Sequence, residues 1–180
     1  MNKQKALLII DVQSLLFDSI PAPFEAKEVI ARINQLSIWA RNKAIPVIFI
    51  QHEAPNSPIE FGSAGWQLQG DLIKAESDLF VRKTTPNSFL HTNLKELLDA
   101  QSIEHLIICG YATEFCVDTT TRQAAAFGYS IDLVANAHTT QDKAHASAQF
   151  IREHHNQTLS NIKSFGVKIA AVRVDELLTN

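Results

Sequence analysis

Short apolar runs alternate with longer stretches of helical periodicity along the whole chain, and this alternation constrains the fold most. Six runs are predicted to be strands: Ala6–Val12, Ile45–His52, Ser77–Lys83, Glu104–Tyr111, Tyr129–Ala137 and Val167–Val174. Strands that are apolar on both faces and separated by helices are typical of a parallel sheet covered on both sides. We therefore predict an α/β fold with three layers, α/β/α, around a six-stranded parallel sheet of the Rossmann-like class.

The stretches between these runs carry the helical pattern. Apolar residues recur at helical spacing between Glu25 and Lys43, with charged residues on the opposite side. Three further helices are predicted over His91–Ser102, from about Glu114 to Phe127, and over Lys143–Leu159. The sequence contains no repeat, low-complexity segment or linker, so we expect residues 1–180 to form a single domain.

Composition narrows the classes of function. Hydrophobic residues make up 46% of the chain, charged residues 19%, and the formal net charge is −3, as in ordinary globular proteins. The sequence shows no basic run typical of nucleic-acid binding and no apolar run long enough for a membrane, and we expect no cleavable leader. Two cysteines cannot build a disulfide framework, which favours thiol chemistry in a reducing compartment. We expect a cytoplasmic protein that acts on a small molecule, without nucleic-acid or membrane partners.

Polar residues close three of the predicted strands. Asp11, His52 and Lys83 stand at these ends, and ligands of parallel sheets bind beyond the carboxyl ends of the strands. Each residue also has an ordinary interpretation. Asp11 fits a helix cap or turn, and Lys83 fits a solvated surface lysine.

Cys116 lies just after the fourth predicted strand, in the first turn of the next predicted helix. The positive potential of a helix start favours a thiolate and predicts a lowered thiol pKa. A carboxylate at a neighbouring strand end, such as Asp11, could take the thiol proton. A lysine there, such as Lys83, could keep that carboxylate ionised. A lone cysteine is usually a buried apolar residue, and this is how we interpret Cys109, inside its strand.

Three segments carry a resemblance to a known family: IDVQ (Ile9–Gln13), RKTTPNSF (Arg82–Phe89) and ICGYATEFCVDTTTRQAAAFGY (Ile108–Tyr129). In order and spacing they resemble the isochorismatase-like cysteine hydrolase superfamily, which includes nicotinamidases and N-carbamoyl amidohydrolases. The resemblance runs from the first predicted strand to about Ala137 and more weakly beyond. It implies the isochorismatase-like hydrolase fold for the whole domain.

The resemblance also implies a site. Asp11, Lys83 and Cys116 would form a catalytic triad that works through a thioester-type intermediate. A non-proline cis peptide would join Tyr111 to Ala112, and the N–H groups of Ala112 and Cys116 would form an oxyanion hole. Relatives assemble as homo-oligomers, so we expect one here.

One departure concerns metal. Nicotinamidases carry an Asp-x-His pair and further histidines that bind a divalent ion, whereas this chain has Gln51 near the expected aspartate and His52 as the nearby histidine. One histidine with Glu53 makes a poor zinc site. The segment resembles the metal-free branch, so no metal or other cofactor is expected. A second departure is Asn136, where many relatives have aspartate.

Four aromatic residues are candidates for the substrate pocket: Phe17, Trp66, Tyr111 and Phe115. Ordinary core or interface packing is an equally good interpretation of their aromatic side chains.

The predicted reaction is hydrolysis of a small amide, ureide or related C–N bond. Two alternatives remain: vinyl-ether hydrolysis without a covalent step, as in isochorismatase, and a non-catalytic binding or assembly protein with the same fold. The presence of Cys116 argues against the first alternative, and the intact triad argues against the second.

Overall fold

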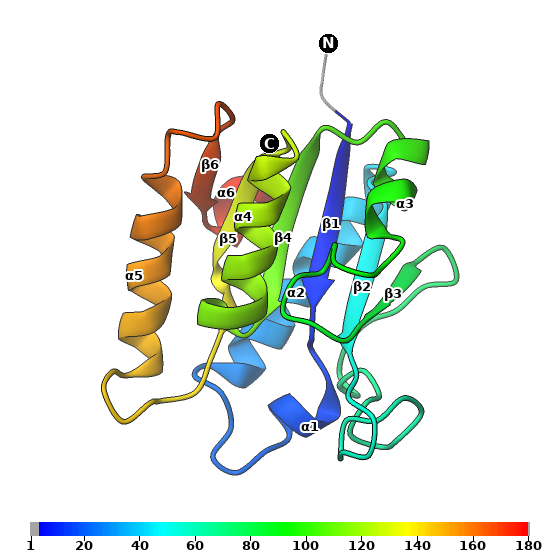
Figure 1. Cartoon of the computed structure of the whole chain (residues 1–180), viewed down its shortest axis with the longest axis vertical. Coiled ribbons are helices and arrows are strands. Elements are labelled where there is room, and N and C mark those ends of the chain that lie inside the picture. The colour runs from blue at the N-terminus through cyan, green and yellow to red at the C-terminus, as the bar shows by residue number, and fades with distance from the viewer. Residues whose placement is uncertain (1–3, 180) are drawn as a thin grey trace.

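The computed structural model describes residues 4–179, which form one six-stranded sheet between two layers of helices (Figure 1). The strands are β1 (Lys5–Ile10), β2 (Val47–His52), β3 (Leu79–Lys83), β4 (His105–Tyr111), β5 (Ser130–Thr139) and β6 (Ile169–Val172). Their order is β3-β2-β1-β4-β5-β6, and all neighbouring pairs are parallel. The predicted fold class is confirmed.

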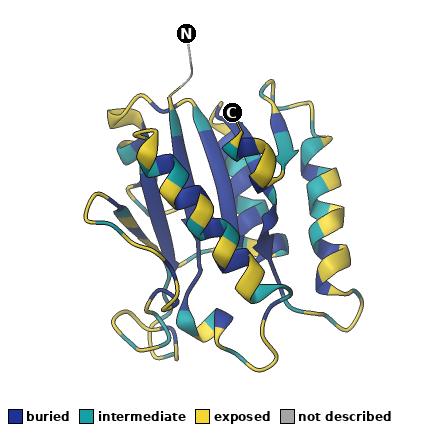
Figure 2. Cartoon of the chain, turned by 180° about the vertical axis from the view of Figure 1, so that it is seen from behind, coloured by how far each residue is buried: buried dark blue, intermediate teal, exposed yellow. Residues whose placement is uncertain are grey.

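The connections between the strands supply the outer layers. They contain α1 (Ser14–Phe17), α2 (Ala26–Asn42), α3 (Leu94–Ala100), the π-helical turn η1 (Thr113–Val117), α4 (Asp118–Ala126), α5 (Ala148–Ser160) and, after β6, α6 (Val174–Leu178). The inner strands are buried along their length, and the helices expose their outer faces (Figure 2). Across residues 4–179, no helix combines the length and the apolar character that a membrane span requires.

The central strand β1 shows why the sheet needs both layers. Leu8 and Ile10 pack in a core cluster with α3, α4 and α5, whereas Leu7 and Ile9 pack in a second cluster with α2 and α6. All four side chains are fully buried. Burying an apolar side chain of this size contributes about 1.5–3 kcal/mol. A strand that is apolar on both faces gains this energy only when helices cover both.

The chain reverses its direction across the sheet between β3 and β4. It runs outward from β1 through β2 to the edge strand β3, and then returns past β1 to place β4 on the other side. Loops that leave β1 and β4 therefore diverge beyond the carboxyl ends of these two strands. Such a reversal point is where parallel sheets hold ligands.

Gly110 allows β1 and β4 to approach closely at this point. Its φ is +119°, and a Cβ added there would lie 2.1 Å from the carbonyl oxygen of Ile10. The register between β4 and β5 also shifts between Ile108 and Gly110. Only glycine combines this backbone conformation with the missing side chain.

Several helix boundaries differ from the sequence predictions. The helix predicted from about Glu114 begins as the π-helical turn η1, and α3 is shorter than predicted at both ends. The helix predicted from Lys143 begins only at Ala148, because Ser147 caps it by accepting a hydrogen bond from Phe150 N at 3.2 Å. The short helices α1 and α6 were not predicted.

Candidate active site

Asp11 follows β1 directly and lies at the centre of the candidate site. Its φ is +52°, in the left-handed region that residues with a side chain rarely adopt. The Asp11 backbone N–H donates to the Ile50 carbonyl of β2 at 2.8 Å, and the residue is 1% exposed. Neighbouring backbone thus holds Asp11 in a strained conformation, a feature that is common at functional sites.

Lys83 joins Asp11 to Cys116. It is the last residue of the edge strand β3, and its side chain is 0% exposed. Its Nζ lies 2.6 Å from Asp11 Oδ2 and 3.3 Å from Cys116 Sγ. The structure therefore brings together these three sequence-predicted residues from β1, β3 and the turn after β4.

The charges of Asp11 and Lys83 are buried, and one oxygen of the Asp11 carboxylate lacks a hydrogen-bond partner among the described residues. A buried carboxylate is stable only when it is paired, which the Lys83 ammonium achieves. Asp11 Oδ1 is also buried, and among the described residues no hydrogen-bond partner occupies it. One carboxylate oxygen is thus held by the lysine, and the other is available to accept a proton.

Cys116 is half-buried on η1 and is a thiol at rest. Burial raises its pKa to about 12; the Asp11 charge adds to the rise and the Lys83 charge opposes it. The predicted lowering of this pKa by a helix start is therefore wrong. The physical reason is that desolvation and the nearby carboxylate both disfavour the thiolate. The thiol needs a base before it can act as a nucleophile.

Cys109 differs from Cys116 in its burial and in its thiol pKa. It is 0% exposed within β4, and its Sγ lies 3.5 Å from the Leu8 carbonyl oxygen. Burial raises its pKa further than that of Cys116. The interpretation of Cys109 as a core residue is confirmed.

The turn that carries Cys116 starts at Ala112. The peptide bond between Tyr111 and Ala112 is cis. The Ala112 carbonyl then accepts hydrogen bonds from the N–H groups of Phe115 and Val117, both at 3.1 Å. These contacts curl the backbone around Cys116 immediately after β4.

A buried histidine that sequence reasoning missed anchors the same turn. His138, at 0% exposure in β5, places Nδ1 2.8 Å from Thr113 Oγ1 and Nε2 2.9 Å from Asn156 Oδ1. Burial lowers its pKa to about 4, so the ring is neutral near pH 7. His138 thereby ties η1 to β5 and α5. A polar residue within an apolar strand was its only sequence signal.

Gln13 was also missed as a site residue, although it belongs to the IDVQ segment. Its buried amide donates to the carbonyls of His52 at 3.0 Å and Trp66 at 2.8 Å. Its Oε1 accepts from the His52 backbone N–H at 2.8 Å. Gln13 thus clamps the end of β1 to the end of β2 and to the Trp66 loop.

The residues at the expected metal position have other partners. The Gln51 amide donates to the Trp66 carbonyl at 3.0 Å, and His52 Nδ1 faces Lys83 Nζ at 3.4 Å. Residues 4–179 contain no cluster of three or more His, Cys, Asp or Glu side chains suited to a metal. The side chains present do not fit the nicotinamidase type of metal centre.

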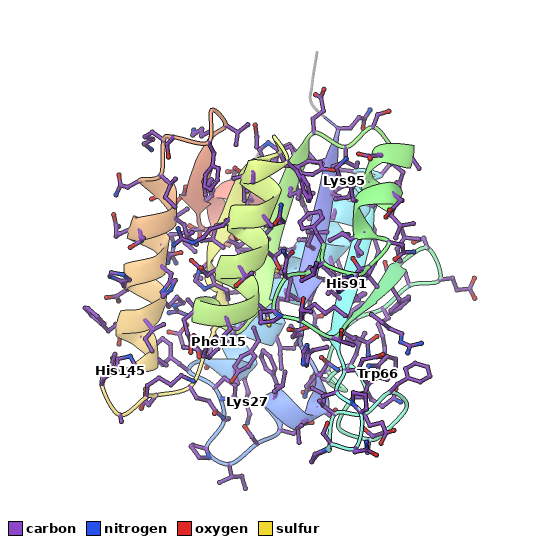
Figure 3. All side chains as sticks on the ribbon, viewed as in Figure 1. Lys27, Trp66, His91, Lys95, Phe115 and His145 are labelled. Atoms are coloured by element: carbon purple, nitrogen blue, oxygen red, sulfur yellow. The ribbon has the colours of Figure 1, made fainter. Side chains whose placement is uncertain are left out.

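The four candidate pocket residues lie in three separate places, because Phe17 and Tyr111 pack together. Phe17 packs edge-on against Tyr111, with ring centroids 5.9 Å apart. Trp66 packs against Phe61 and lines a cavity of about 750 Å³ that also touches Lys83. Phe115 is 53% exposed and lines a different, apolar cavity of about 320 Å³. Figure 3 shows Trp66 and Phe115 on opposite sides of the lower half of the molecule.

Asn136 has a structural contact away from the thiol. Its Oδ1 accepts from the Val174 backbone N–H at 3.1 Å, and its carbonyl accepts from Arg32 at 3.0 Å. The side chain thus caps the start of α6 from β5.

Comparison with known proteins shows which family this chain matches. The model of the isochorismatase domain matches residues 5–172. A streptothricin hydrolase of Streptomyces noursei is 34% identical over 77% of this chain, and the match spans 50% of that relative's length. Nicotinamidase 3 of Arabidopsis thaliana is 28% identical over 92% of this chain and 83% of its own.

A solved structure agrees with these matches. The crystal structure of an isochorismatase family protein superposes with a TM-score of 0.87 and 35% identity, covering 94% of this chain and 98% of that one. The likeness therefore extends over nearly the whole of both chains.

Proposed function

The chain belongs to the isochorismatase family, and from this membership and its site we propose a hydrolase with a cysteine nucleophile. Cys116 is the nucleophile, Asp11 the proton acceptor and donor, and Lys83 the cation that supports both. The observation that carries the proposal is the position of Lys83 Nζ, 2.6 Å from Asp11 Oδ2 and 3.3 Å from Cys116 Sγ, out of contact with solvent.

The first half-reaction forms a thioester. Asp11 takes the proton from Cys116 Sγ as the sulfur attacks the substrate carbonyl carbon, because the resting thiol is a weak nucleophile. The carbonyl electron pair moves onto oxygen, where the N–H groups of Ala112 and Cys116 stabilise it. One such donor contributes about 2.7–4 kcal/mol to the transition state. Protonated Asp11 then gives its proton to the leaving nitrogen, and the C–N bond breaks.

The second half-reaction releases the acid. Water attacks the thioester carbonyl while Asp11 accepts a proton from that water. The C–S bond breaks, the acid leaves, and the sulfur recovers a proton from Asp11. Asp11 thus works in both steps, whereas Lys83 keeps its charge throughout.

The substrate class follows from the leaving group that this arrangement can serve. Asp11 can protonate a departing nitrogen, which an amide, ureide or N-carbamoyl compound provides. The names of the relatives fit this chemistry, since one is a nicotinamidase. We therefore assign a small amide or ureide C–N bond to the site.

The test is a panel of small amides, ureides and N-carbamoyl compounds, followed by ammonia release. Wild type is expected to hydrolyse a member of the panel, and Cys116→Ser is expected to lose that turnover while keeping its melting temperature. Ammonia release that persists in Cys116→Ser would contradict the proposed nucleophile.

A further inference from the structure

The Lys83 ammonium has a third neighbour besides the carboxylate and the thiol. His52 Nδ1 lies 3.4 Å from Lys83 Nζ. A lysine ammonium carries three N–H donors and no acceptor. Asp11 Oδ2, Cys116 Sγ and His52 Nδ1 therefore offer one acceptor for each donor, in a place where the lysine side chain is 0% exposed.

The position of His52 does not depend on Lys83 alone. The two residues are register partners in the parallel pairing of β2 with β3. The Gln13 amide holds both backbone polar groups of His52, and the imidazole also hydrogen-bonds the backbone of Thr85. The His52 backbone is thus held by Gln13 and by the pairing with β3, its ring is held by the loop after β3, and Nδ1 faces the ammonium.

The surroundings keep the His52 ring neutral. Burial lowers its pKa, and the Lys83 charge lowers it further, while Asp11 and Glu53 oppose these effects. The opposition from Glu53 is limited because its carboxylate pairs with Arg82 at 2.7 Å. A neutral imidazole can carry its single proton on Nε2 and leave the Nδ1 lone pair free to accept from Lys83.

We propose that His52 is a positioning residue, whose Nδ1 accepts one N–H of Lys83 and thereby directs the other two to Asp11 and Cys116. This inference rests on the proposed function, because the ammonium matters only if carboxylate and thiol react. Without the acceptor, the ammonium can rotate and loses the fixed alignment toward the sulfur. The thiolate that forms during attack is then less stabilised.

Four variants test the proposal through alkylation of Cys116, which needs no substrate. His52→Leu removes the acceptor. His52→Asn places an amide oxygen near the position of Nδ1, whereas His52→Gln extends its amide toward the position of Nε2. His154→Leu is the matched control, since His154 is exposed on α5. The readout is the iodoacetamide rate constant at Cys116 at pH 8, with the melting temperature measured in parallel.

We expect His52→Leu and His52→Gln to slow alkylation about tenfold, and His52→Asn to stay within about threefold of wild type, as for a hydrogen bond to a charged group. His154→Leu should not change the rate. With a panel substrate, kcat should fall in the same order while KM stays constant.

Alkylation of the Leu and Gln variants at the wild-type rate would overturn the proposal, as would an Asn variant as slow as Leu. Both results would leave the nucleophile role of Cys116 intact. If the proposed function itself were wrong, a different result would appear: the Cys116→Ser variant would still hydrolyse the amide.

Discussion

The buried ion pair of Asp11 and Lys83 is the central feature of the candidate site at the scale of single residues. Each of these charges would be costly to bury alone, and each is stabilised by the other at 2.6 Å. Cys116 lies at their side as a thiol that needs a base. In the proposed mechanism, the pair supplies a proton acceptor that is shielded from water.

Cys116 should react with iodoacetamide well before Cys109, because Cys109 is fully buried. Burial raises the Cys116 pKa to about 12, so the thiolate fraction should grow about tenfold per pH unit across the whole measurable range. Peptide mass spectrometry after brief labelling at several pH values checks both points. Labelling of Cys109 first, or a rate plateau between pH 6 and about 8, would contradict this account.

Lys83→Met should lower kcat across the pH–rate profile. The variant removes the ammonium that lies 2.6 Å from Asp11 Oδ2 and 3.3 Å from Cys116 Sγ. Turnover near neutrality should fall by about 10²–10³-fold, the range for the loss of one group that stabilises developing charge. Lys168→Met, at an exposed position just before β6, is the control. Wild-type turnover in Lys83→Met would show that the ammonium supports neither the carboxylate nor the thiol.

Sequence reasoning grouped Asp11, Lys83 and Cys116 because each stands at a strand end or in the turn that follows, and the structure places the three side chains together. It missed Gln13 and His138. The hydrogen-bond partners of Gln13 lie 39 and 53 residues away in the sequence, and those of His138 lie 25 and 18 residues away. No local pattern marks such contacts. The predicted direction of the Cys116 pKa was wrong because the burial of the thiol depends on the whole fold.

At the scale of elements, the ends of β1 and β4 decide where the site forms. The strands were predictable because both faces of each inner strand are apolar. The start of α5 was not predictable, because the turn that joins Lys143 to Ala146 has no strong sequence signal. The π-helical form of η1 also has no signature in residues Thr113–Val117.

Gly110→Ala should damage both stability and activity. The added Cβ would lie 2.1 Å from the Ile10 carbonyl oxygen, and the φ of +119° is unfavourable for alanine. We expect a loss of at least about 3 kcal/mol, or roughly 10 °C in melting temperature. Gly70→Ala, whose Cβ would meet no atom within 4 Å, should be nearly neutral. Equal melting temperatures for the two variants would contradict the close approach of β1 and β4.

His138 should make stability depend on pH. Its pKa is lowered to about 4 in the folded protein, against 6.5 for an unperturbed ring, so the unfolded chain binds a proton first as pH falls. The contribution of His138 to the free energy of unfolding is fully present above about pH 6.5. It falls by roughly 3 kcal/mol between about pH 6.5 and pH 4. Urea unfolding at several pH values measures the effect. His138→Asn should flatten the curve in this window, and an unchanged pH dependence would argue against the buried neutral ring.

At the scale of the whole molecule, one reversal of strand order brings distant segments together. Residues 11, 83 and 116 meet because β1, β3 and β4 all end at the same edge of the sheet. The fold class could be predicted from the alternation of elements, whereas the strand order required the tertiary structure. The homo-oligomer expected from the family resemblance stays a prediction.

The most direct test of the central claim is mass spectrometry of the protein quenched during turnover. Using the panel compound that releases ammonia fastest, wild type should gain the mass of the acyl group on the peptide that contains Cys116. Cys116→Ser should show no adduct and nearly no turnover, because a serine hydroxyl is far harder to deprotonate. If Cys116→Ser kept turnover within about tenfold of wild type, without an adduct in either protein, the thioester mechanism would be wrong.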